Sequence, residues 1–250
     1  MIQIQSLVSN TECPPESEEW LGIIRNNLFE GEGYSLYVAV FITKCTHVQA
    51  TILSLLRRRD FVAAEGQYES MVEQLTAADD ELQNYANTKS DYNEKFDIYM
   101  RNLYCSAIIK GYSYLLLLAN FLTHHASSRV PLHQLRSERA QFVKMVRVAA
   151  QSILDSIPVA LGPLKTGKDK SPRVLFDSIK MVWPLTAVYL VGPTLPEQKN
   201  QAEIALTFIG KVVGVRQALN TYPGKMPLPL EARVPLDLMP GEASSPASSK

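Results

Sequence analysis

The segment from Gly162 to Lys168 reads Gly-Pro-Leu-Lys-Thr-Gly-Lys and matches seven of the eight positions of a phosphate-binding loop. Such a loop surrounds phosphate with backbone N–H groups and a Lys, and a Ser or Thr at its eighth position binds Mg²⁺. The eighth position here is Asp169. The segment also follows a predicted helix, whereas a phosphate-binding loop follows a strand. We therefore interpret it as a solvated basic loop and not as a nucleotide site.

Metal binding and nucleophilic catalysis also lack a complete pattern. Zinc sites usually take their ligands from close pairs of Cys or His. Cys45 and His47 are two residues apart on different faces of a predicted helix, and His124 and His125 lie at a helix end, where positive charge is favoured. Cys105 falls inside an apolar helix, as a core Cys does. We predict no metal site and no bound cofactor.

The residues that remain as candidates lie mainly on one apolar segment, 97–124. We expect this segment to be the central helix, whose side chains would line any pocket inside a helical bundle. Trp183 joins them from a later helix. No single one of these side chains is assigned a catalytic role. The candidate pocket residues are Tyr99, Arg101, Tyr104, Tyr112, Tyr114, His124 and Trp183.

Apolar residues recur at three- and four-residue spacing through most of the chain, which is the pattern of amphipathic helices. No stretch alternates with a period of two for long enough to predict a strand. Two of the segments are joined by the polar run Arg57–Asp60 and predict an antiparallel hairpin. We predict an all-α, antiparallel array of about six to seven helices, at about 36–56, 61–85, 97–124, 132–157, 174–191 with a kink at Pro184, and 197–220.

Three regions are predicted along the chain. Residues 1–17 are expected to form an irregular N-terminal lead-in. Residues 18–222 are expected to form a single helical domain, in which Trp183 is buried. Residues 223–250 are rich in Pro and Ser, and we expect them to be extended or disordered.

Composition limits the function classes. The 250 residues have a formal net charge of zero, so no overall field attracts the chain to nucleic acid. The basic runs at 57–59 and 165–173 are short, and we predict no specific binding of duplex DNA by the chain alone. Three widely spaced Cys residues and no secretory leader indicate a reducing, intracellular location, nuclear or cytoplasmic. Of these two, the nuclear location is implied only by the family resemblance described below. The apolar stretch 103–122 contains Lys110 and is expected to be a core helix, not a membrane span.

Three stretches resemble a known family. They are Tyr99-Met-Arg-Asn-Leu-Tyr-Cys-Ser-Ala-Ile-Ile, Ile153-Leu-Asp-Ser-Ile-Pro-Val-Ala-Leu-Gly and Met181-Val-Trp-Pro-Leu. With the order of the predicted helices, they make residues 20–225 similar to the C-terminal regulatory domain of fungal binuclear zinc-cluster transcription factors, of the type that regulates natural-product gene clusters. The family's DNA-binding module has six closely spaced Cys residues. This chain has three, far apart, so that module is absent and its DNA specificity is not implied.

Two classes of function follow. The resemblance implies a regulatory or interaction protein tied to a secondary-metabolite gene cluster, with a protein partner or a hydrophobic small-molecule effector. The alternative is a cofactor-free enzyme or small-molecule binder of natural-product biosynthesis, of the cyclase, isomerase or dehydratase type. A homodimer through the long hairpin is a further open alternative. A cavity lined by converging polar groups would favour the second class, and a filled core with one exposed apolar patch would favour the first.

Overall fold

The computed structural model describes residues 2–27, 33–88, 94–125, 129–162, 172–220 and 228–238, with side chains from Ile4, Ile98 and Val174 onward in three of these ranges. Every regular element in the described residues is helical, which confirms the predicted all-α class. The six long helices correspond to the six predicted segments. They are α3 (Gly33–Arg58), α4 (Phe61–Thr88), α5 (Glu94–Leu122), α6 (Leu132–Asp155), α8 (Pro172–Leu190) and α9 (Pro196–Phe208).

The described helices outnumber the six to seven that were predicted. The additional ones are short: α1 (Ile2–Ser9), α2 (Ser17–Asn26), α7 (Ile157–Leu161) and α10 (Leu230–Arg233). A helix of four to ten residues contains too few turns for its periodicity to stand out in a sequence window. The last predicted helix is also shorter than 197–220. After α9 the chain continues as a π-helical turn, Ile209–Val213, and a 3₁₀ turn, Arg216–Leu219.

The two ends of the chain differ from the expected irregular structure. Residues 2–9 form α1, which packs on α3 and buries Leu7. At the other end, residues 228–238 include α10 and the 3₁₀ turn Leu236–Leu238, and Ala232 is fully buried. We call residues 228–238 the strap. The rest of the predicted tail, 221–227 and 239–250, lies outside the described residues, as does most of the basic loop, 163–171.

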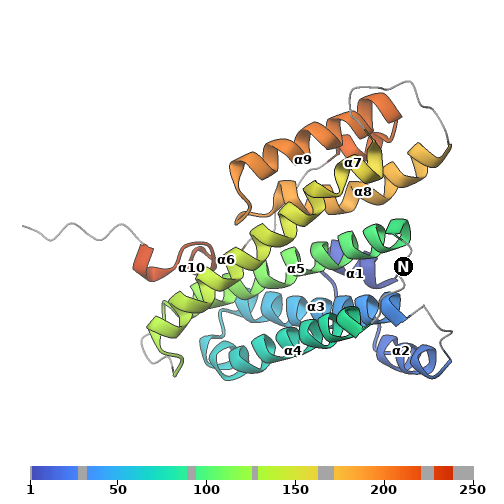
Figure 1. Ribbon diagram of the computed structural model, residues 1–250. Coiled ribbons are helices and arrows are strands. Elements are labelled where there is room, and N and C mark those ends of the chain that lie inside the picture. Colours follow the sequence, from blue (N-terminus) through green and yellow to red (C-terminus); the bar gives the residue numbers. More distant parts are fainter. Residues whose placement is uncertain are drawn as a thin grey trace, which may run out of the picture.

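Helices α3 and α4 form the predicted antiparallel hairpin (Figure 1). Its turn contains Arg59 in the left-handed region, with φ of 51°. Asp60 follows and caps α4, since its Oδ1 accepts a hydrogen bond of 3.0 Å from the backbone N–H of Ala63. The polar run that ends at Asp60 therefore supplies both the sharp reversal and the start of the second helix.

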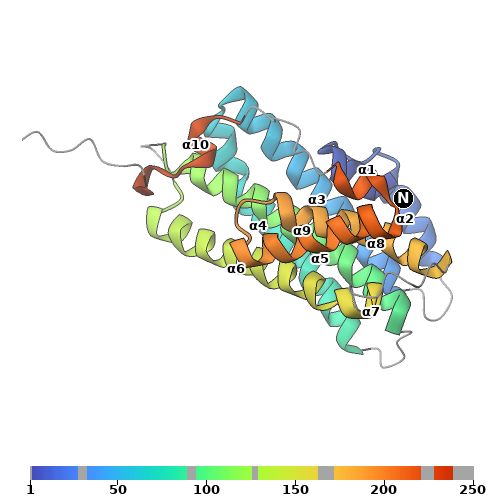
Figure 2. The same ribbon diagram turned by 90° about the horizontal axis from the view of Figure 1, so that it is seen from above.

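Helix α5 occupies the centre of the bundle. It packs against α3, α4, α6, α8 and α10. In Figures 1 and 2, the α3–α4 hairpin lies on one side of α5, α8 and α9 lie on the other, and α6 crosses obliquely between the two groups. The central position of the segment 97–124 agrees with the sequence prediction.

Among the described helices, α3 and α5 are long and apolar enough to cross a membrane by length and composition alone. In this fold, 61% of the apolar window of α3 and 78% of that of α5 are buried inside the protein. A helix buried on most of its surface by neighbouring helices has the composition of a core helix. The apolarity of both helices is therefore explained by their packing.

Candidate functional site

A cavity of about 850 Å³ opens between α5, α6 and α8. This volume lies within the range of roughly 300–1,000 Å³ that is usual for small-molecule sites. The end of α1, the turn after α8 and the strap complete its walls. Many of the lining side chains are apolar; they include Val8, Leu116, Leu117, Val143, Leu190 and Leu228.

Lys110 of α5 is the charged group deepest in the bundle at this cavity, and it is half-buried. Its Nζ donates a hydrogen bond of 2.5 Å to Oδ1 of Asn10. Burial lowers the pKa of Lys110 from its ordinary value of 10.5 to about 8, because a charged amine loses its hydration there. The rings of Tyr114 and Trp183 lie 5.4 and 5.9 Å from Nζ, a distance at which their faces stabilise a cation.

Asn10 places the acceptor of this cluster. It follows α1 with φ of 58°, a left-handed conformation that Asn tolerates better than most residues. Its Oδ1 accepts hydrogen bonds from Lys110 at 2.5 Å, from the Tyr114 hydroxyl at 2.9 Å and from Nε2 of Gln49 at 3.0 Å. An amide oxygen has two lone pairs, so three donors compete for it. Burial raises the pKa of Tyr114 to about 12, which keeps its hydroxyl a donor at neutral pH.

Trp183 lines the same cavity from α8. It is half-buried, whereas the sequence led us to expect a fully buried side chain. Its indole N–H is shielded from solvent and has no hydrogen-bond partner among the described residues. Pro184 follows it inside α8, and the helix continues through this proline. The indole N–H is therefore enclosed by protein, and it is the ring of Trp183 that contributes to the cavity wall.

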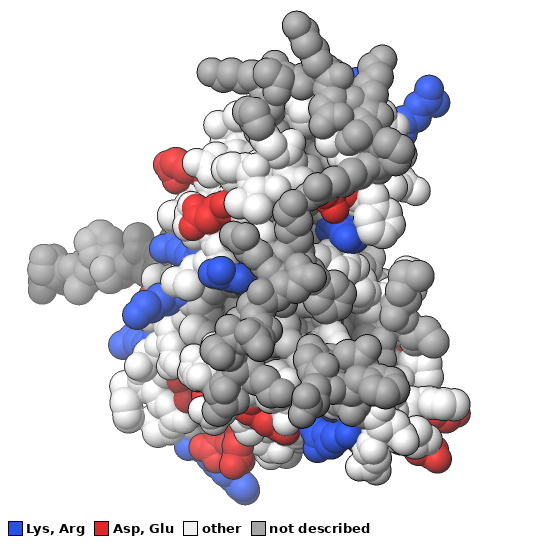
Figure 3. Space-filling model, turned by 45° about the vertical axis from the view of Figure 1, so that its right-hand side comes forward, with Lys and Arg blue, Asp and Glu red and all other residues white. Residues whose placement is uncertain are grey.

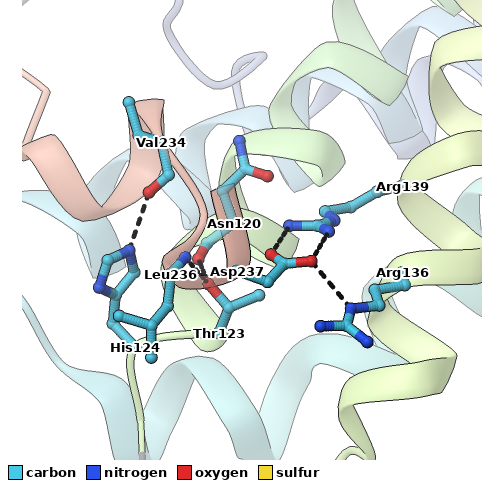
Figure 4. A network of polar contacts seen from close by, with 8 residues as sticks. All are labelled: Asn120, Thr123, His124, Arg136, Arg139, Val234, Leu236 and Asp237. Carbon is cyan, nitrogen blue, oxygen red and sulfur yellow. Dashed lines mark hydrogen bonds and ion pairs between the residues drawn. The ribbon is translucent and has the colours of Figure 1, made fainter. Parts of the chain in front are cut away.

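The strap forms one end of the cavity, to which it contributes Leu228 and Arg233. Two side chains at the end of α5 bind its backbone, and Figure 4 shows the contact that His124 makes with Val234. Asn120 Nδ2 donates to the carbonyl of Ala232 at 3.1 Å, and His124 Nε2 donates to the carbonyl of Val234 at 2.8 Å. His124 thus holds a neighbouring segment, in addition to lying at the helix end as predicted.

The end of the strap is fixed by charge. Asp237 forms a two-pronged ion pair with Arg139, both N–O distances being 2.8 Å, and a third contact of 2.8 Å with Nε of Arg136 (Figure 4). The Arg139 guanidinium is the main reason that the pKa of Asp237 falls to about 2. The backbone N–H of Leu236 also donates to Thr123 Oγ1 at 2.8 Å. The strap is therefore anchored to both α5 and α6.

The structure brings only two of the seven sequence candidates to the cavity wall, Tyr114 and Trp183. Tyr104 instead faces α4, where its hydroxyl donates to Asp79 and accepts from Gln83 Nε2 at 2.7 Å. Tyr112 is buried, and the centre of its ring lies 5.7 Å from that of Phe142 on α6. Both tyrosines fail as pocket residues because they project from α5 toward other helices.

The other three candidates also lie elsewhere. Tyr99 is half-buried, and Nζ of Lys180 lies 5.1 Å from the centre of the Tyr99 ring. Arg101 is exposed on the outside of α5. His124 binds the strap. Asp79 is buried beside Tyr104, and burial raises its pKa.

The sequence analysis missed Asn10, Lys110, Arg147 and Arg233 as cavity residues. Lys110 carried a usable signal: an amine in the middle of an apolar helix, with Ser113 and Tyr114 three and four residues later on the same face. Asn10 and Arg233 gave none, because they reach the cavity from the segments that were expected to be irregular. Among the described residues, no group of three or more His, Cys, Asp or Glu lies close enough to hold a metal ion.

The outer surface offers two other features. On the face shown in Figure 3, basic side chains lie in small groups between acidic ones over the described residues. Exposed apolar side chains also follow the outer side of α7 and α8, namely Val159, Leu175, Phe176 and Ile179. The molecule thus has both a cavity and an apolar patch, and the cavity brings Asn10, Lys110 and Tyr114 together beside apolar walls.

The site is therefore a half-open cavity with an apolar lining, one amine of lowered pKa and one phenol. Such a site can bind an apolar molecule and orient one polar oxygen of it. Comparison of the chain with family models, with curated proteins and with solved structures gives no match in any of the three cases.

Proposed function

We propose that this protein binds an apolar small molecule in the cavity between α5, α6 and α8, as the effector-binding domain of a regulator. The observation that carries the proposal is the cavity of about 850 Å³ with Lys110 and Tyr114 on its wall. A lysine that served only the fold would place its amine in water, because burying an uncompensated charge costs stability. A ligand would compensate for that cost.

The regulatory part of the proposal rests on the sequence. Residues 20–225 resemble the regulatory domain of fungal zinc-cluster transcription factors, which implies that binding is read out by a partner and not by turnover. The apolar patch formed by Val159, Leu175, Phe176 and Ile179 offers a surface for such a partner, and the amine of Lys180 lies 4.2 Å from the centre of the Phe176 ring on it. The cavity supports the proposal more strongly than the patch does.

A titration with the neutral probe N-phenyl-1-naphthylamine tests the binding proposal. The chain has two Trp residues, and Trp20 is 63% exposed on α2, away from the cavity. In a Trp20→Phe background, Trp183 alone reports binding. We expect a 1:1 complex, in which energy transfer quenches Trp183 while the fluorescence of the probe rises.

A matched pair of variants locates the probe. Ser113→Phe adds a ring to the cavity wall, and the Ser113 hydroxyl bonds only to the Ile109 carbonyl of its own helix, so the fold loses little. Ile179→Phe adds an apolar ring to the exposed patch. We expect Ser113→Phe to weaken probe binding about 10-fold or more, in line with loss of about 1.4 kcal/mol, and Ile179→Phe to leave it unchanged. Equal affinities in the two variants would contradict the proposal.

The lowered pKa of Lys110 supports a second candidate, a cofactor-free acid–base enzyme. An amine with a pKa of about 8 is partly neutral near physiological pH and can accept a proton. Lys110 would remove a proton from the carbon beside a ligand carbonyl while Tyr114 donates a proton to the carbonyl oxygen, which gives an enol. Tyr114 then takes its proton back from the enol oxygen. Return of the Lys110 proton to the same carbon regenerates the ketone, and its delivery to the opposite face of that carbon gives a stereoisomer.

The test is deuterium exchange into 4-phenylbutan-2-one in D₂O, followed by NMR. The enzyme candidate requires exchange that is faster with the wild type than with Lys110→Met. Equal rates would remove it and leave the binding proposal intact.

A further inference from the structure

The donors around Lys110 outnumber the acceptors. Lys110 has three N–H bonds, of which one is used by Asn10. Tyr114 donates to the same acceptor atom. This point of the cavity therefore has more hydrogen-bond donors than acceptor oxygens.

The charge of the cavity has one sign. Its described lining includes three basic side chains, Lys110, Arg147 and Arg233, and no Asp or Glu. Arg147 is partly occupied, since its Nε donates to the Pro193 carbonyl at 3.0 Å. Burial is the only influence resolved on the pKa of Lys110, so no carboxylate within the described structure offsets its charge. A buried cation without a counter-ion favours an anionic ligand.

The spacing of the donors fits one small anion. Lys110 Nζ and the Tyr114 hydroxyl both lie within 2.9 Å of the same oxygen, so one carboxylate spans the two. Such a group would take the unused N–H bonds of Lys110 and compete with Asn10, whose oxygen already has three donors, for the Tyr114 hydroxyl. The remainder of a ligand would lie against apolar walls such as Leu116, Leu117 and Val143.

We propose that the ligand is an apolar carboxylic acid whose carboxylate binds Lys110 and Tyr114 while its hydrocarbon part fills the cavity. This assignment rests on the proposed binding function. It names the class of effector: an acid with a long aliphatic or aromatic body, and not a neutral terpene, an alcohol or an amine.

Two matched pairs of ligands test the assignment: dodecanoate against dodecanol, and biphenyl-4-carboxylate against biphenyl-4-methanol. Affinities are measured from Trp183 emission in the Trp20→Phe background at pH 7. We expect the acid of at least one pair to bind about 10-fold or more tightly than its alcohol, which is the discrimination of a charge-assisted hydrogen bond. Preference for the alcohol in both pairs, or equal affinity in both, overturns the assignment.

Variants of Lys110 separate the two proposals. Lys110→Met keeps the length of the side chain and removes its charge, so we expect it to abolish the preference for the acid and to leave the affinity for the alcohol within about twofold. Lys110→Arg retains the charge and should keep part of the preference. The neutral naphthylamine probe reports on the cavity itself. Binding of that probe without any preference for acids means that this assignment fails and the binding function stands; no binding of the probe means that the binding function fails.

Discussion

Helix α5 carries two polar clusters that satisfy their hydrogen bonds in different ways. On the side facing α4, the Tyr104 hydroxyl lies between Asp79, which is buried, and Gln83, which is exposed, and we call this cluster closed because each hydrogen-bond partner is a side chain of α4. On the side facing the cavity, Lys110 and Tyr114 share the single oxygen of Asn10. The first cluster is complete without a ligand, whereas the second has more donors than acceptors. Incomplete hydrogen bonding beside a cavity, and not the presence of tyrosines, distinguishes the candidate site.

The largest expected effect comes from adding bulk on each side of α5. A Cβ on Gly111 would lie 2.9 Å from Leu75 Cδ2 and 3.2 Å from Cys45 Sγ, so Gly111→Val overpacks the core. Ser113, two residues later, lies on the cavity wall. We expect Gly111→Val to lower the free energy of unfolding by about 3 kcal/mol and Ser113→Val to change it by less than about 1 kcal/mol. Urea denaturation measures both. A similar loss in the two variants would mean that the cavity side is packed as tightly as the core.

Removal of one hydroxyl on each side gives the next largest effect. Tyr104→Phe leaves the buried Asp79 carboxyl without its main donor, and we expect a loss of about 2 kcal/mol in the free energy of unfolding. Tyr114→Phe leaves Asn10 with its two other donors, so the expected loss is below about 1 kcal/mol. Thermal unfolding at pH 7 compares them. Equal losses would contradict the difference between a closed and an open cluster.

The strap forms one end of the cavity, and loosening it by a single substitution gives an intermediate effect. Asp237→Ala breaks the contacts with Arg136 and Arg139, and we expect it to cost about 1–2 kcal/mol. Hydrogen exchange should accelerate at residues 230–238 and not in the α3–α4 hairpin. Because the pKa of Asp237 is about 2, the wild-type contact persists from neutral pH down to about pH 4 and is lost only as the pH falls through 2. Leu238→Ala, at an exposed position of the same segment, is the control.

The sequence predicted the class and the long helices well because each has several turns of regular apolar spacing. α4 is the clearest case. Its buried residues Tyr68, Met71, Leu75 and Leu82 are three, four and seven residues apart, which places them on one face of the predicted helix. The short helices α1 and α10 were missed because their burial depends on contacts with distant segments. Leu7, for example, is buried by the packing of α1 on α3, and Ala232 by α5.

The candidate site was predicted less well, and the reason is geometric. Six of the seven candidates were taken from one helix without separating its faces. Successive residues on a helix are about 100° apart, so Tyr112 and Tyr114 project in nearly opposite directions. The set of Lys110, Ser113, Tyr114 and Leu117 shares one face, and all four line the cavity. Asn10 completes the cluster from a distance of 100 residues along the chain, which no local pattern reveals.

The smallest expected effect is the pH dependence of Lys110, which tests whether the open cluster holds a buried charge. The folded pKa of about 8 is lower than the ordinary 10.5, so between these values the unfolded chain keeps a proton that the folded chain has lost. The contribution of Lys110 to stability therefore rises with pH above about 8 and is at its lowest, and constant, below about 7. The other charged groups of the cavity are Arg147 and Arg233. The raised pKa of Tyr114, about 12, keeps its hydroxyl neutral over this range.

The measurement is the difference in the free energy of unfolding between wild type and Lys110→Met at pH 7 and pH 9, in which the titration of all other groups cancels. From pH 7 to pH 9, we expect the free energy of unfolding of the wild type to rise relative to that of the variant by about 1 kcal/mol or less. A single proton sets the limit, at about 1.4 kcal/mol per pH unit. Dodecanoate binding should change in the opposite direction and weaken above pH 8, because the neutral amine no longer pairs with the carboxylate. If the difference in the free energy of unfolding is the same at pH 7 and pH 9, the Lys110 amine is hydrated in the folded protein. The contrast between the two sides of α5 would then be one of shape alone.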